Sequence, residues 1–125
     1  MSSLPGDRAA RGVVDWLPAG LDPGSLRGML RTMLAIRQFD QRALELYREG
    51  VMGGTTHPYI GMEGVAVGTC AALRPGDRIT STHRGHGHCL AKGGDPRLMM
   101  AELLGKATGY YKAVSYTHLT LPTKA

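Results

Sequence analysis

The chain is 125 residues long, 42% hydrophobic and carries a formal net charge of +5, which indicates one globular domain with a modest core. The charge fits an anionic partner such as a phosphorylated cofactor, although a solvated, arginine-rich surface explains it by itself. We expect no nucleic-acid partner, because the sequence lacks dense Lys and Arg with interleaved aromatic residues.

Three features bear on the location of the protein. Cys70 and Cys89 are the two cysteines, and they fall in different expected elements. They do not form the disulfide framework that is typical of small secreted proteins. No apolar run approaches the length of a membrane span, and the N-terminus lacks the apolar core of a signal peptide. We therefore expect a cytoplasmic protein with no membrane partner.

The first expected helix follows a flexible N-terminal lead at residues 1–21, which is rich in Gly, Pro, Ser and Arg. Asp22 and Pro23 form a helix-start signal, and Gly50 is a stop signal. Between them, apolar residues recur every three or four positions and predict one long amphipathic helix. These residues are Leu26, Leu30, Met33, Ile36, Phe39, Ala43 and Leu46.

A second helix is expected over residues 62–73, after a Gly-rich loop at residues 51–61 that contains His57 and Pro58. Gly64, Gly68 and Ala72 are spaced by four, which would permit the close approach of another backbone. His57 by itself is explained as a surface loop residue.

The remaining elements complete a mostly helical α/β fragment with one short parallel strand. After a turn, residues 78–82 are rich in β-branched side chains and predict a short strand. Residues 90–92 form a helical turn in this prediction, and the capping signal Asp95-Pro96 begins a third helix over residues 96–104. Ligands bind beyond the carboxyl ends of strands in open α/β folds, so we expect a site after residue 82.

The most informative segment is residues 80–89, which hold three of the five histidines, with Arg84 and two glycines among them. Arg84 has a planar guanidinium that suits phosphate, and the histidines can transfer protons. A phosphate-bearing ligand therefore fits these residue types well.

Three alternatives stay open from the residues alone. His83, His86, His88 and Cys89 could form a small metal-binding module, although the second ligand pair of common zinc patterns is missing. The segment could also be a Gly-rich surface turn with solvated histidines. The third alternative is a basic interaction domain without catalysis.

Two motifs and a following helix resemble one family. Residues 57–68 (HPYIGMEGVAVG) resemble the H-x-Y-x-G-Q-E-A-x-x-V-G stretch of thiamine-diphosphate-dependent dehydrogenase alpha subunits. Residues 81–88 (STHRGHGH) are similar to the S-T-[YH]-R-x-H-G-H segment of that family. Residues 95–109 match its next helix, and the resemblance extends over about residues 25–112 in the family's order and spacing.

The resemblance implies a function, a site and partners. It implies the N-terminal part of a thiamine-diphosphate-binding doubly wound fold over residues 22–112. Such enzymes are oxidoreductases that cleave acetoin or decarboxylate a 2-oxoacid and pass the acyl group to lipoyl-lysine. The implied cofactors are thiamine diphosphate and Mg²⁺, and the implied partners are a beta subunit, in a heterotetramer of two alpha and two beta chains, and a lipoyl-bearing acyltransferase. It assigns His57 and His86 to the active site as catalytic residues, and His83 and Arg84 to the cofactor; no metal ligand is assigned.

Some positions depart from the family pattern. His83, Gly85 and Cys89 look most like the acetoin-type subset, with pyruvate as the alternative substrate. Met62 and Gly64 replace the usual Gln and Ala of the family. These two differences affect the local packing of the second expected helix and remove no cofactor contact of the family. The family's Gly-Asp-Gly motif with a downstream Asn, which binds Mg²⁺ and diphosphate, does not follow residue 109. We therefore expect an inactive fragment whose residues 113–125 are a non-family tail, similar to translated adapter sequence.

Overall fold

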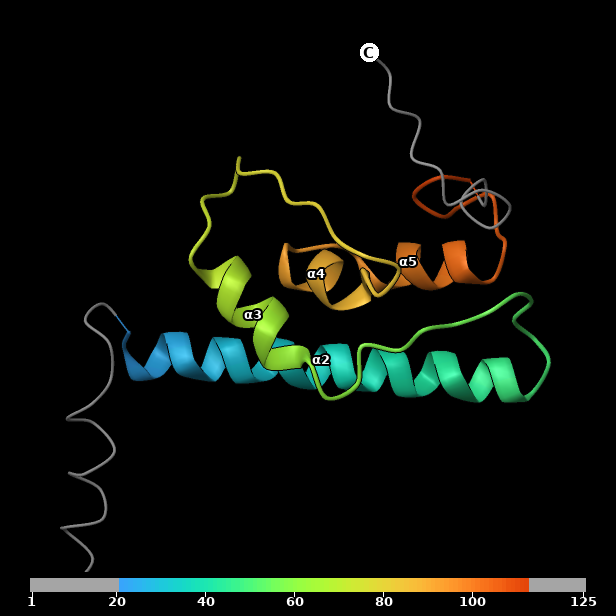
Figure 1. The fold of residues 1–125 in the computed structure, drawn as a ribbon, viewed down its shortest axis with the longest axis horizontal. Coiled ribbons are helices and arrows are strands. Elements are labelled where there is room, and N and C mark those ends of the chain that lie inside the picture. Colours follow the sequence, from blue (N-terminus) through green and yellow to red (C-terminus); the bar gives the residue numbers. More distant parts are fainter. Residues whose placement is uncertain (1–20, 113–125) are drawn as a thin grey trace, which may run out of the picture.

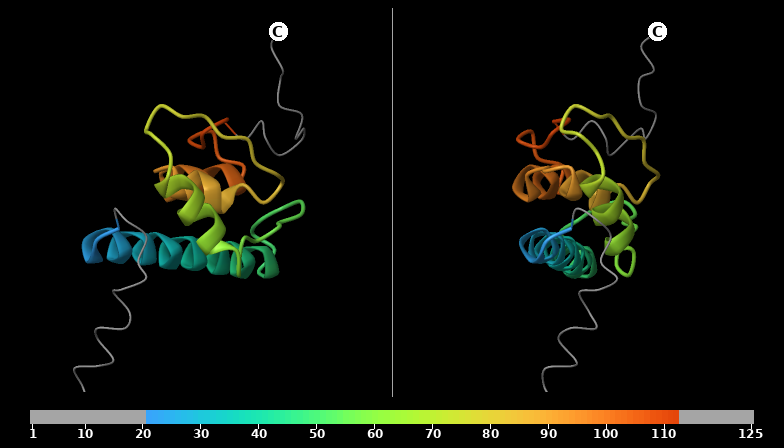
Figure 2. Two further views of the ribbon diagram at one scale, coloured as in Figure 1. Left: turned by 60° about the vertical axis from the view of Figure 1, so that its left-hand side comes forward. Right: turned by 90° about the vertical axis from the view of Figure 1, so that its left-hand side faces the viewer.

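A computed structural model describes residues 21–112, so the predictions for residues 1–20 and 113–125 lie outside the described residues. The long helix α2 forms one layer, and three shorter helices pack along one of its sides (Figure 1). The turned views in Figure 2 show the same two-layer arrangement. The mostly helical character is confirmed by α2 (Pro23–Arg48), α3 (Glu63–Ala71), α4 (His86–Ala91) and α5 (Pro96–Leu103).

The ends of α2 are set by local signals in the sequence. The Asp22 carboxylate accepts from the backbone N–H of Gly24 at 2.6 Å and of Ser25 at 3.1 Å, with Pro23 in the first turn. These bonds satisfy donors that have no partner inside the helix. At the other end, Gly50 adopts a left-handed φ of 72°, which stops the helix. Both predicted ends of this helix are confirmed.

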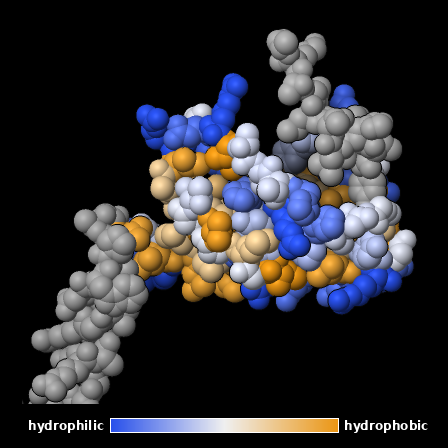
Figure 3. Space-filling view, viewed as in Figure 1, coloured by the Kyte–Doolittle hydropathy of each residue, from blue (hydrophilic) through white to orange (hydrophobic). Residues whose placement is uncertain are grey.

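The core lies between α2 and the three short helices. Ile36 and Phe39 of α2 pack against Tyr59, which lies in the loop before α3. They also pack with residues of α3, α4 and α5. The first half of α2 is different, because Leu30 and Leu34 are 55% and 53% exposed. Apolar side chains are therefore visible at the surface along α2 in Figure 3. The buried cluster consists of Ile36, Phe39, Tyr59, Ala66, Val67, Leu90 and Met99.

The predicted strand at residues 78–82 is wrong. These residues have no regular secondary structure, and no strand is found anywhere in residues 21–112. β-Branched residues favour an extended backbone, but a strand needs a neighbouring strand to complete its hydrogen bonds. No such neighbour occurs in this part of the chain, so the segment crosses the surface as a loop between α3 and α4 (Figure 1).

The second half of the histidine segment is helical. The structure places His86, His88 and Cys89 on α4, where we expected a helical turn only from residue 90. Gly87 explains the close packing of this helix, because a Cβ added there would overlap the ring of Tyr59. Gly64 and Gly68 are exposed instead: an added Cβ would be in ordinary contact with Met33 at Gly64 and would meet nothing at Gly68, so the close approach is that of α4 to Tyr59.

Across residues 21–112, no helix combines the length and the apolar character needed to cross a membrane.

The packing of Gly87 generates a stability prediction. We expect Gly87→Ala to lower the free energy of unfolding by about 1–3 kcal/mol, because the new methyl group must displace the buried Tyr59 ring. Gly68→Ala is the matched control, since nothing lies within 4 Å of its added Cβ. It should be neutral or stabilise by up to about 1 kcal/mol. Urea denaturation of the two variants measures both effects, and equal stabilities would contradict the packing argument.

Candidate functional site

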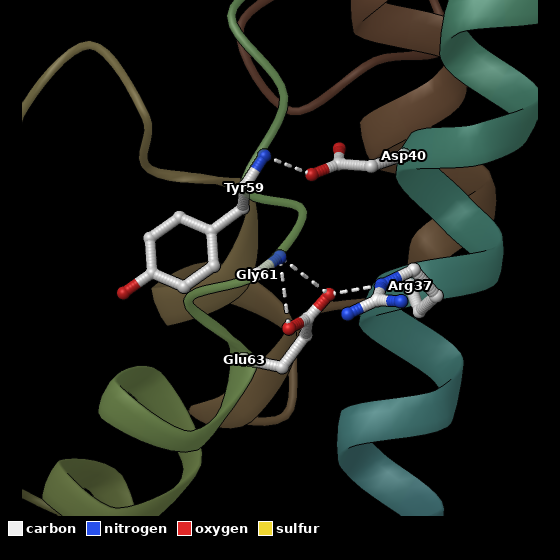
Figure 4. A network of polar contacts seen from close by, with 5 residues as sticks. All are labelled: Arg37, Asp40, Tyr59, Gly61 and Glu63. Carbon is white, nitrogen blue, oxygen red and sulfur yellow. Dashed lines mark hydrogen bonds and ion pairs between the residues drawn. The ribbon is translucent and has the colours of Figure 1, made fainter.

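Asp40 is a buried carboxylate on α2 with an exposed fraction of 0%. One of its oxygens, Oδ2, accepts a hydrogen bond from the backbone N–H of Tyr59, which Figure 4 shows. The other oxygen, Oδ1, lies 2.8 Å from Nδ1 of His86. Asp40 thus joins α2 to the loop that contains His57 and to α4, which begins with His86.

Glu63 is a second buried carboxylate, at the start of α3. It accepts from the backbone N–H of Gly61 at 3.1 and 3.0 Å and forms an ion pair with Arg37 of α2 (Figure 4). The hydrogen bond from Arg37 is the main cause that lowers the pKa of Glu63 to about 2, against the opposing effect of burial. Glu63 therefore stays ionised at neutral pH and fixes the turn that leads into α3.

A pocket of about 490 Å³ brings together three of the four predicted site residues, His57, His83 and His86. The rings of His57 and His83 meet edge to face, with centroids 4.8 Å apart and an interplanar angle of 80°. Two loops far apart in the sequence therefore meet at one site. The wall also includes side chains from the region of α5, namely Met99, Leu103, Tyr110 and Tyr111.

The fourth predicted residue, Arg84, is not among the residues that line this pocket. Its Nη1 donates to the backbone carbonyl of Pro58 at 3.3 Å, so the side chain ties the histidine segment to the His57 loop. His88 is also outside the wall. Its ring contacts Tyr59 edge to face at 5.3 Å, and its Nδ1 lies 3.0 Å from Oγ of Ser81.

These positions do not support the metal-binding alternative. Among residues 21–112, no three His, Cys, Asp or Glu side chains are grouped so that they could hold a metal ion. Within the same segment, His86 pairs with Asp40 while His88 contacts Ser81 and Tyr59. Burial raises the pKa of the Cys89 thiol, which disfavours the thiolate that a metal would need.

Sequence reasoning missed Asp40 and Thr56. Asp40 lies within the apolar stripe of the first helix, next to Phe39 and near Ala43, and a carboxylate on an apolar face is itself a signal of a buried polar contact. Thr56 lines the pocket, and its Oγ1 is buried without a hydrogen-bond partner in the described part of the chain. No pattern in the sequence distinguishes Thr56 from Thr55.

A pocket lined by three histidines, one of which is paired with a buried carboxylate, has the composition of a cofactor or substrate site in an enzyme. Comparison with known proteins identifies the family. The model of the dehydrogenase E1 component family matches residues 30–121, and the chain belongs to that family. The family generally uses thiamine diphosphate.

The chain is similar to curated relatives of two kinds. It is 58% identical over 84 residues to the alpha subunit of acetoin:2,6-dichlorophenolindophenol oxidoreductase from Bacillus subtilis, covering 67% of this chain and 25% of the relative. It is 49% identical over 89 residues to the pyruvate dehydrogenase E1 alpha subunit of Zymomonas mobilis, covering 70% and 25%. For the acetoin:2,6-dichlorophenolindophenol oxidoreductase alpha subunit of Cupriavidus necator, the identity is 45% over 100 residues, covering 80% and 30%.

The chain thus spans about a quarter of the length of these relatives. No solved structure gives a significant match.

The ion pair of Glu63 generates a prediction about pH. Because the folded-state pKa is lowered from 4.5 to about 2, the pair stabilises the fold above pH 4.5 and loses this effect as the pH falls toward 2. We expect Glu63→Gln to be less stable than the parent chain by about 1–3 kcal/mol at neutral pH. This difference should shrink as the pH is lowered, which urea denaturation across the acid range measures.

Glu45→Gln is the matched control for that experiment. Glu45 forms an ion pair with Arg42, which also lies on α2, but both side chains are more than half exposed. It should change stability by less than about 0.5 kcal/mol at every pH. A constant difference between Glu63→Gln and the parent chain down to acid pH would contradict the assignment.

Proposed function

We propose that this chain contributes to the alpha subunit of a thiamine-diphosphate-dependent dehydrogenase of the E1 type, and that its histidine pocket is part of the cofactor and substrate site. The observation that carries the proposal is the meeting of His57, His83 and His86 in one pocket of about 490 Å³. These residues come from the two motifs that carry the family resemblance. Packing through Asp40 and Tyr59 brings the two motifs together, and it places these three imidazoles at one pocket.

The residues present fit such a cofactor. The pocket volume falls within the range of about 300–1,000 Å³ that is common for sites of small molecules and cofactors. Thr56 Oγ1, buried without a partner in the described residues, is a polar atom that a bound polar group would satisfy. His83 lines the pocket and Arg84 lies next to it in the chain, between the lining residues His83 and Gly85. His83 and Arg84 would hold the diphosphate, since each can donate hydrogen bonds to phosphate oxygens. Mg²⁺ would accompany the diphosphate, with ligands other than the residues assigned here.

His57 and His86 are the residues that we assign to proton transfer. When bound, thiamine diphosphate supplies the carbanion chemistry that breaks the bond beside a carbonyl group. Protons must be gained and lost at the substrate oxygen and carbon during such a reaction, and imidazoles exchange them near neutral pH. Both rings line the pocket, and both sit on segments that Asp40 holds through Tyr59 and His86.

Acetoin is the substrate that we propose first, and pyruvate is the alternative. The acetoin-type resemblance of His83, Gly85 and Cys89 supports this order, and His83 and Cys89 both line the pocket. Relatives of both kinds are similar to this chain. We further propose a beta subunit as the direct partner, in a heterotetramer, a lipoyl-bearing acyltransferase as the acyl acceptor, and a cytoplasmic location.

The decisive experiment is an assay of the complete alpha subunit, expressed from its full reading frame and purified together with its beta partner. Reduction of 2,6-dichlorophenolindophenol, the acceptor named for two relatives, is followed with acetoin or pyruvate, with and without thiamine diphosphate. We expect cofactor-dependent reduction that is faster with acetoin. Faster reduction with pyruvate would make pyruvate, and not acetoin, the proposed substrate. If neither compound supports cofactor-dependent reduction, the proposed function is wrong.

Arg84 provides a prediction about cofactor affinity. We expect Arg84→Gln in the same assembled protein to weaken thiamine diphosphate binding by about tenfold to a hundredfold, as expected when a charged hydrogen bond to phosphate is lost. Thiamine without phosphates should bind equally to both forms. Calorimetric titration measures both affinities. The matched control is Arg78→Gln, an exposed residue of the preceding loop, which should leave affinity unchanged; a similar loss in both variants would point to general charge attraction instead.

A further inference from the structure

We propose that Asp40 is a positioning residue that holds neutral His86 as its Nδ1–H tautomer and so leaves Nε2 as the hydrogen-bond and proton acceptor that faces a ligand. The role of this acceptor in a reaction rests on the proposed function, whereas the tautomer itself does not. Neither motif of the family resemblance contains Asp40, which lies 46 residues before His86 in the chain.

Each carboxylate oxygen of Asp40 has one hydrogen-bond partner. Its side chain is fully buried, Oδ2 is engaged by the backbone N–H of Tyr59, and Oδ1 lies 2.8 Å from Nδ1 of His86. A backbone N–H can only donate, and an ionised carboxylate can only accept. Both oxygens of Asp40 are thus acceptors with one donor each, and the donor at Oδ1 is the Nδ1–H group of His86.

The tautomer of His86 follows from this arrangement. A neutral imidazole carries one N–H and one unprotonated nitrogen, so a proton on Nδ1 leaves a lone pair on Nε2. The ring is only 16% exposed and packs edge to face on Phe39, with centroids 5.7 Å apart. Since His86 lines the pocket and Nδ1 is taken by Asp40, Nε2 is the ring nitrogen that remains for a ligand.

The other described histidines lack this constraint. His57 and His83 are exposed and contact each other through their rings. Nδ1 of His88 faces the hydroxyl of Ser81, which can either donate or accept, so that contact does not select a tautomer. Among these side chains, the structure assigns a carboxylate partner to His86 alone.

The chemical consequence is a preference for ligands that present a proton. Nε2 of neutral His86 would accept a hydrogen bond from an O–H or N–H group of the ligand. If the proton transfers, it moves from the ligand atom to Nε2, the bonding electron pair stays on the ligand, and the imidazolium is stabilised by the adjacent Asp40 carboxylate. A ligand that offers only acceptors at this point would find no donor on neutral His86.

The substitution Asp40→Asn tests this assignment because it keeps the shape and removes one acceptor. An asparagine side chain has an oxygen that accepts and an NH₂ group that donates. The backbone N–H of Tyr59 needs the oxygen, so the NH₂ group must face Nδ1 of His86. Nδ1 must then accept, and the proton moves to Nε2. The variant is expected to reverse the dominant tautomer without changing the fold.

Heteronuclear NMR of nitrogen-labelled histidine side chains in the full chain reads the tautomer directly, at about pH 9 where ordinary histidines are neutral. His86→Gln assigns the resonances. We expect the Nδ1–H form for His86 in the parent chain and the Nε2–H form in Asp40→Asn. The matched control Asp22→Asn replaces an exposed cap at the far end of α2 and should leave every histidine unchanged. Circular dichroism verifies that each variant is folded.

An Nε2–H form in the parent chain would overturn the proposal, even if Asp40→Asn fails to fold. An unchanged Nδ1–H form in folded Asp40→Asn would overturn it as well. The spectra are recorded without thiamine diphosphate, so they are independent of the binding and activity experiments. A failure of those experiments with the expected tautomers present would count against the proposed function and leave the role of Asp40 in place.

Discussion

The burial of the Asp40 carboxylate is the constraint on which the arrangement of this site depends. Moving a carboxylate out of water costs several kcal/mol unless it is paired or hydrogen-bonded. This cost is comparable to the whole net stability of a small domain. Asp40 has an exposed fraction of 0% in the middle of the α2 core face, so its partners must come to it. The backbone of Tyr59 and the ring of His86 do so. The loop with His57 and the helix α4 are thereby held against α2.

A steric constraint acts at the same place. The ring of Tyr59 is buried and lies against Gly87, where any side chain would overlap it. The same ring contacts His88 edge to face. Tyr59 therefore positions α4 through its ring and the His57 loop through its backbone. Gly87 therefore has a packing role in this segment, because it leaves room for the Tyr59 ring.

The polar side chains of the two motif segments and of α2 divide into buried supporting groups and exposed ones. Asp40 and Glu63 are buried and hold loops in place through backbone N–H groups. His57 and His83 are exposed and available to a ligand. Arg84 stands between these classes, because one guanidinium nitrogen bonds the Pro58 carbonyl while the side chain remains partly exposed. Such a division, with rigid support behind accessible imidazoles, is what a preorganised site requires.

The sequence by itself determined the features that depend on near neighbours. The Asp-Pro starts of α2 and α5 and the Gly50 stop act within a few residues, and the structure has them as expected. The two family motifs also predict site roles for His57, His83 and His86, which the tertiary structure places at one pocket. Only the tertiary structure decided the remainder. The segment at residues 78–82 has the composition of a strand, but pairing needs a second strand, which local composition cannot supply. The partnership of Asp40 with His86 spans 46 residues, and which buried carboxylate meets which imidazole depends on how the helices pack.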